Sequence, residues 1–200
     1  MFSWRWIIIA LIVFGAWQQY QKHVQKPVQH ASGVLVQRDP VQNMLARGEV
    51  WQKDHYTIKA LADFDVEARV LSKELYRTGR EADLSPVDLA LGWGVMSDSE
   101  VLAALKISQS GRFYFYRWEN QPPRPPVEIA RHSANMHMIP ADRDIEERLK
   151  AVRPGQIVHL RGKLVTVSAP DGWRWNSSLT RDDTGAGACE LLRVESMDVR

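Results

Sequence analysis

A regular alternation of residue types, running from Tyr56 to Leu71, constrains the fold of this 200-residue chain more than any other feature. Apolar or small side chains occupy the even positions, and most of the odd positions carry charged or polar ones. A period of two places these sets on opposite faces of a β-strand, so the pattern predicts a strand with one buried and one wet face. Because the run is long for a strand, we expect a bend or bulge within it.

Shorter segments predict a mixed fold around this strand. Further strands are expected at 107–118, 128–139, 157–167, 173–178 and 188–194, with a turn at 170–172. Helices are expected at 85–92, 97–105 and 142–152, after the capping residues Ser85, Ser97 and Asp142. The predicted fold class is therefore α+β, with an N-terminal transmembrane helix and a mostly antiparallel, partly closed β-barrel-like domain that carries short helices.

The first 20 residues predict a membrane anchor. Residues 6–17 contain no charged side chain, and aromatic rings flank this run at Trp4 and Tyr20. A helix over 3–20 is slightly shorter than the roughly 30 Å hydrocarbon core, and a cleavable signal peptide is the alternative. We expect an anchor at 1–20, a polar stalk at 21–48 and a globular domain at 49–200. The expected location is the bacterial inner membrane, single-pass, with the domain in the periplasm.

The charges of the chain are unevenly distributed, although its net charge is only +2. Residues 49–105 hold six Lys or Arg against eleven acids, whereas residues 106–181 hold thirteen against seven. Such asymmetry indicates either an anionic partner or two parts of one domain that attract each other.

Several phrases of the sequence resemble a known family. They stand at 61–71, 88–98, 132–137 and 171–175, and at Cys189-Glu190. Together they are similar to a family of uncharacterised bacterial proteins predicted to be single-pass and membrane-anchored, and the resemblance covers about residues 50–195. It implies membrane anchoring but brings no activity and no catalytic residues.

Aromatic and basic side chains on two predicted strands form the expected binding surface. One strand face carries Arg112, Tyr114, Tyr116 and Trp118, and a basic row on another strand carries His159, Arg161 and Lys163. Trp93 lies between two glycines, and we expect its ring on a flexible turn beside this surface. Aromatic rows stack sugars or bases in some barrels, but ordinary core packing and a solvated charged face are the alternative.

Cys189 is the chain's single cysteine, so no intrachain disulfide is possible. It is a candidate nucleophile, with His132 or His137 as base. Backbone amides of 184–188 are candidate oxyanion donors, and Asp182 or Asp183 is a candidate for orienting the base. The alternative is a small buried structural residue.

The two histidines of this region do not predict a metal site. His132 and His137 are five positions apart, so on a strand they face opposite sides. Phosphate-binding loops and dinucleotide fingerprints are missing from the sequence. We therefore expect neither a metal nor a cofactor.

The expected function is a membrane-anchored, cell-envelope binding or assembly module without catalytic activity. Its expected partners are the membrane, through residues 3–20, and an envelope protein; nucleic acid is not expected. The alternatives are a thiol-dependent hydrolase that uses Cys189 and His137, and a barrel that binds oligosaccharides or nucleic acids.

Overall fold

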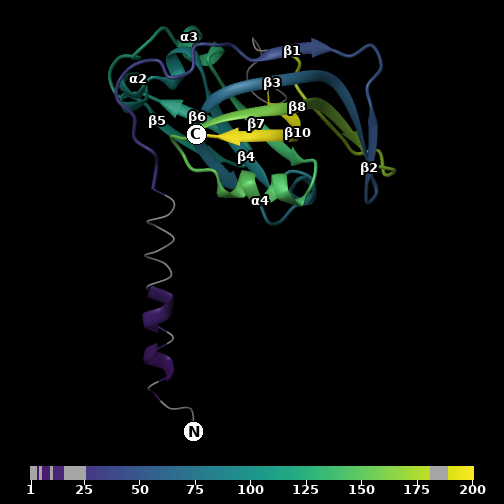
Figure 1. Cartoon of the computed structure of the whole chain (residues 1–200), viewed down its shortest axis with the longest axis horizontal. Coiled ribbons are helices and arrows are strands. Elements are labelled where there is room, and N and C mark those ends of the chain that lie inside the picture. Colours follow the sequence, from purple (N-terminus) through teal and green to yellow (C-terminus); the bar gives the residue numbers. More distant parts are fainter. Residues whose placement is uncertain (1–3, 5, 10, 16–25, 181–188) are drawn as a thin grey trace.

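The computed structural model describes residues 4, 6–9, 11–15, 26–180 and 189–200. Its central element is the long strand β3 (Tyr56–Leu75), which confirms the strand predicted from the alternating pattern. The expected irregularities are present, because the pairing register shifts between Ala60 and Ala62 and again between Val70 and Ser72. β3 curves through the molecule, as Figure 1 shows.

The strands around β3 form a ring. β3 pairs with β4 (Val87–Gly92), β4 with β7 (Ser133–Pro140), β7 with β10 (Glu190–Val199), β10 with β8 (Ile157–Ser168), and β8 again with β3. The β7–β10 pair is parallel, and the other pairs of this ring are antiparallel.

Shorter strands extend this arrangement. β1 (Val41–Met44) and β2 (Val50–Lys53) pair with β3, and β9 (Arg174–Asn176) pairs with β8. β5 (Lys106–Ser110) and β6 (Phe113–Arg117) form a separate hairpin.

The main core is built from the buried faces of the ring strands together with α4 (Arg143–Ala151). A second small core lies around Met96 and Ile129. It is bounded by the short helices η2 (Gly94–Ser97), α2 (Ser99–Ala103) and α3 (Pro126–Arg131), while η1 (Arg80–Asp83) precedes β4.

The structure contradicts the predicted fold class, because the described residues form a mostly β fold rather than an α+β fold with a transmembrane helix. The clearest error is the helix expected at 85–92. Residues 87–92 of this segment form β4, and all six of these residues are buried. A strand that is buried on both faces has no alternation and resembles a short helical segment in sequence.

Other element predictions had mixed outcomes. The helix capped by Asp142 is confirmed as α4, and the Asp142 side chain accepts a hydrogen bond from the Ile145 amide. The strand expected at 128–139 is in part α3, and β7 begins at Ser133. The cap of α2 is Asp98 rather than Ser97.

No helix among the described residues is long and apolar enough to cross a membrane. This finding contradicts the predicted anchor at 3–20 and the single-pass location derived from it. Residues 1–3, 5, 10 and 16–20 of that anchor lie outside the described part of the chain.

The segment predicted as a stalk lies against the domain over its described residues. β1 belongs to the main sheet, and Val36 is buried in the core. The Val28 amide donates to the Pro154 carbonyl, and the Gly94 amide donates to the Val36 carbonyl. Residues 21–25 of the segment are outside the described part.

Candidate functional site

The ring brings three reactive side chains together from distant parts of the sequence. Asp88 on β4 lies directly opposite His137 in the antiparallel register with β7. Cys189 immediately precedes β10, whose first residue Glu190 is the register partner of Met136. The pairing of β4, β7 and β10 therefore places an acid, an imidazole and a thiol side by side.

Asp88 and His137 form a buried ion pair. The Asp88 side chain has no exposed surface, and its Oδ2 lies 2.9 Å from Nδ1 of His137. The pair is close but not aligned for a hydrogen bond, a looseness that is common in catalytic pairs before substrate binds. Cys189 is half-buried, and its side chain interacts with the imidazole of His137.

The surroundings of His137 favour its protonated form. Burial lowers the pKa of this imidazole, but the interactions with Asp88 and with Cys189 outweigh burial and raise its pKa to about 9. Since Nδ1 faces Asp88, Nε2 is the ring nitrogen available to the thiol. The site therefore holds a proton-carrying imidazole between the Asp88 carboxylate and the sulfur of Cys189.

Arg112 supplies a second cation to Asp88. It lies in the turn of the β5–β6 hairpin with φ of 69°, and its Nη1 donates to Asp88 Oδ1 at 2.8 Å. Its Nη2 donates to the Ser85 carbonyl at 3.0 Å, and its guanidinium sits 3.8 Å from the ring centroid of Tyr76. The buried carboxylate is thus paired on both oxygens, which offsets the free energy lost on removing it from water.

A polar amide flanks the thiol on the other side. Asn135 lies two residues before His137 on β7, and its Nδ2 is 3.7 Å from Sγ of Cys189. The same Nδ2 donates to the main-chain carbonyl of Arg112 at 3.0 Å. The thiol is therefore bracketed by an imidazole and an amide.

An aromatic wall leads away from the imidazole. The ring of Trp175 lies 4.9 Å from His137, and Trp173 lies 6.1 Å from Trp175. Arg80 stacks over Trp173 at 4.6 Å and forms a two-point ion pair with Asp171. These half-buried rings give the site an apolar border.

The structure brings together only some of the residues of the predicted thiol site. Cys189 and His137 do lie together, but the Nδ1 of His132 instead bonds the Glu128 carbonyl. The expected orienting acids 182–183 and the amides of 184–188 lie outside the described residues. Asp88 was missed, although a single acid inside the apolar run 87–92 is a signal of a buried functional carboxylate.

The structure separates the residues of the predicted aromatic surface. Trp93 is only 1% exposed and belongs to the core, so it is not a surface ring on a flexible turn. Tyr116 and Trp118 are half-buried against the second core, and the ring of Tyr114 lies tilted beside that of Tyr116, with the centroids 5.6 Å apart. Arg112 points to Asp88 instead of lying with them. The exposed rings of β6 are those of the opposite face, Phe113 and Phe115.

The predicted basic row faces acids of the neighbouring strand. The β3–β8 register places Asp63 opposite Lys163 and Asp65 opposite Arg161. Lys163 pairs with Asp63, and Asp65 lies 3.4 Å from Nε of Arg161 and 2.9 Å from Nε2 of His159. Attraction between two parts of one domain therefore accounts for these charges.

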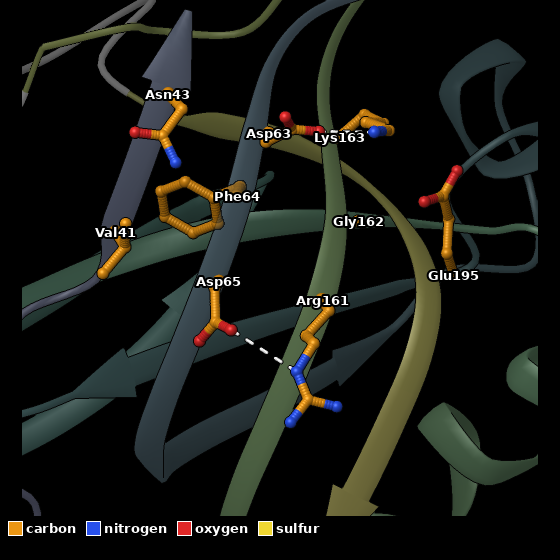
Figure 2. Close-up of a pocket in the computed structure, with 9 residues that line it drawn as sticks. All are labelled: Val41, Asn43, Asp63, Phe64, Asp65, Arg161, Gly162, Lys163 and Glu195. Carbon is orange, nitrogen blue, oxygen red and sulfur yellow. Dashed lines mark hydrogen bonds and ion pairs between the residues drawn. The ribbon is translucent and has the colours of Figure 1, made fainter.

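A shallow groove of about 250 Å³ lies over this charged ladder. Figure 2 shows its lining: Val41, Asn43, Asp63, Phe64, Asp65, Arg161, Gly162, Lys163 and Glu195. Its cations are held by its own acids, so the groove offers little net charge to a ligand. It contains neither the thiol nor the imidazole.

Within the described residues, no group of three or more His, Cys, Asp or Glu side chains is arranged to hold a metal ion. No protein-family model matches the chain, and no curated protein or solved structure is significantly similar to it. The resemblance noted from the sequence therefore stays a prediction.

The titration of His137 predicts a loss of stability in mild alkali. Its pKa is 6.5 in a free side chain and about 9 in the fold, so folding favours the protonated form. The resulting stability is complete below pH 6.5 and is lost as the pH rises through 9. We expect the free energy of unfolding to fall by about 3 kcal/mol over this window. Urea unfolding at pH 6 and pH 9.5 measures the change, and a His137→Gln variant should show much less of it.

Proposed function

We propose that this protein is a thiol-dependent hydrolase in which Cys189 attacks a carbonyl group. The buried Asp88–His137 pair, which meets the side chain of the half-buried Cys189, is the observation that carries this proposal. Nucleophile, base and orienting acid in contact are the arrangement that activates a weak nucleophile in acyl transfer, whatever the fold.

The roles follow from the contacts. His137 holds the proton of the Cys189 thiol before substrate binds, which leaves a thiolate beside an imidazolium, and Asp88 stabilises that imidazolium. The thiolate attacks the carbonyl carbon, and the leaving group departs with the proton from His137. Water then attacks the thioester with His137 as base, which releases the acid and returns the thiol. Every proton in this cycle passes through the buried imidazole, so no further reactant is needed.

A binding module, the function first expected from the sequence, has weaker support. It relied on a joint aromatic and basic surface, but Trp93 is in the core and the cations of β8 are paired with acids of β3. No comparable argument weakens the thiol site, whose residues lie together in the ring.

The proposal predicts a covalent intermediate on Cys189. The full-length chain is incubated with p-nitrophenyl acetate, and the release of p-nitrophenolate and the mass of the Cys189 peptide are measured. We expect an acetylated Cys189 in the wild type and none in Cys189→Ala. Loss of the base in His137→Gln should slow acylation by about 100-fold or more.

His132→Gln is the matched control, because His132 is a half-buried histidine away from the thiol and should leave the rate unchanged. Equal turnover by the wild type and Cys189→Ala, or no acylation of either, would rule the hydrolase out.

A further inference from the structure

We propose that Asn135 is a catalytic residue whose side-chain amide donates a hydrogen bond to the carbonyl oxygen of the substrate. This inference rests on the proposed function and specifies its substrates as acyl donors: esters, thioesters or amides whose oxygen becomes negatively charged during attack. Sequence reasoning placed the oxyanion donors in 184–188 and did not consider Asn135.

The register of β7 places Asn135 correctly for this role. Asn135 and His137 are two positions apart, so they share one strand face and flank Cys189. Nδ2 of Asn135 lies 3.7 Å from Sγ, and Asn135 is only 5% exposed. A buried donor next to the nucleophile stabilises a developing oxyanion more strongly than a donor in water does.

Gln109 fixes which end of the amide faces the thiol. Its Nε2 donates to Oδ1 of Asn135 at 2.7 Å, so Oδ1 is engaged as an acceptor on that side. The opposite end, Nδ2, then points toward Cys189 and the Arg112 carbonyl. An amide nitrogen carries two donor hydrogens and an amide oxygen none, so this orientation is the one that assists an oxyanion.

A main-chain carbonyl oxygen lies where we propose that the acyl oxygen of the substrate binds. The main-chain oxygen of Arg112 is 3.0 Å from Asn135 Nδ2 and 3.9 Å from Cys189 Sγ. It therefore marks where an acyl oxygen meets both groups. A substrate oxygen must replace this carbonyl, whose residue lies at the tip of the β5–β6 hairpin and is held there by the ion pair with Asp88 and by the hydroxyl of Tyr76.

The reaction chosen for the test separates this role from mere packing. Attack of Sγ on an ester moves the carbonyl electron pair onto oxygen before the alkoxide leaves, so a donor at that oxygen accelerates acylation. Attack of Sγ on the saturated carbon of iodoacetamide expels iodide and places no charge on a carbonyl oxygen. The ratio of the two rates at Cys189 therefore reports the oxyanion donor alone.

The experiment measures both rates on the full-length chain. For Asn135→Ala we expect acylation by p-nitrophenyl acetate to slow by about 100-fold, while alkylation by iodoacetamide stays close to the wild-type rate. Gln109→Met removes the hydrogen bond that orients the Asn135 amide. It should lower the ratio of the acylation rate to the alkylation rate by a smaller factor. Gln156→Ala, which removes another half-buried amide that bonds the backbone, should leave the ratio unchanged.

The outcomes are separable. If Cys189 is acylated in the wild type and the ratio is unchanged in Asn135→Ala, the inference is overturned while the hydrolase stands. If Cys189 of the wild type is not acylated, the proposed function fails and the inference with it. Should Asn135→Ala fail to fold, as judged by circular dichroism, Gln109→Met decides: a lowered ratio supports the role of Asn135 and an unchanged ratio overturns it.

Discussion

Replacing Asp88 by Asn is expected to destabilise the fold by about 3–5 kcal/mol, because it leaves two buried cations without their anion. The Asp88 carboxylate has no exposed surface and is paired with Arg112 at 2.8 Å and with His137 at 2.9 Å. An amide of nearly the same size keeps the shape of the site but removes the charge. The loss is measured by urea unfolding at pH 7.

Asp65→Asn is the matched control for this substitution. Asp65 also pairs with several cations, but it lies on the outer face of β3 with its side chain 31% exposed, so its loss should cost less than about 1 kcal/mol. A double variant, Asp88→Asn with Arg112→Met, should be less destabilised than the two single changes added together. If Asp88→Asn behaves like Asp65→Asn, the buried charge cluster is not as the structure has it.

Local patterns in the sequence were sufficient to predict a helix or strand where one face of the element is exposed to water. The strand β3 was predicted from the alternation of Ala62, Phe64 and Val66 with Asp63 and Asp65, since burial of one face imposes a period of two. The helix α4 was predicted from its Asp142 cap for a similar reason: the capping oxygen satisfies a backbone donor, a local need.

Local patterns failed where tertiary contacts cover an element on all sides. β4 is buried on both faces, so its sequence has no alternation and was read as a helix. Serine is a residue type that often caps helices, but the Ser97 hydroxyl accepts hydrogen bonds from the amides of Leu35 and Val36 instead. These partners come from a segment that the sequence predicted as a stalk, so no local rule could identify them.

The site was only half predictable for the same reason. Cys189 and His137 could be proposed from their chemistry, but the choice of the acid depends on which strand pairs with β7. The sequence analysis named Asp182 or Asp183 as the acid that orients the base. The register selects Asp88, far away in sequence. Strand order, which no local signal specifies, decides the composition of the site.

The sequence analysis also placed Trp93 on the surface, whereas the structure buries it. Replacing Trp93 is therefore expected to have the second large effect on stability. Trp93→Ala should destabilise the fold by about 3–5 kcal/mol, because it removes a large fully buried ring from the main core. The sequence placed this ring on a binding surface, where its loss would weaken capture of a partner and leave stability almost unchanged. Thermal and urea unfolding of the isolated protein separate the two interpretations.

Two further variants sharpen the Trp93 test. No acceptor among the described residues bonds the buried Nε1 of Trp93, so Trp93→Phe removes an unsatisfied donor along with part of the ring. We expect it to cost clearly less than Trp93→Ala. Phe115→Ala removes a ring that is 51% exposed, and we expect it to lower the free energy of unfolding by about 0.5 kcal/mol. Equal losses for Phe115→Ala and Trp93→Ala would show that Trp93 does not pack in the core, since only a buried ring leaves a cavity when it is removed.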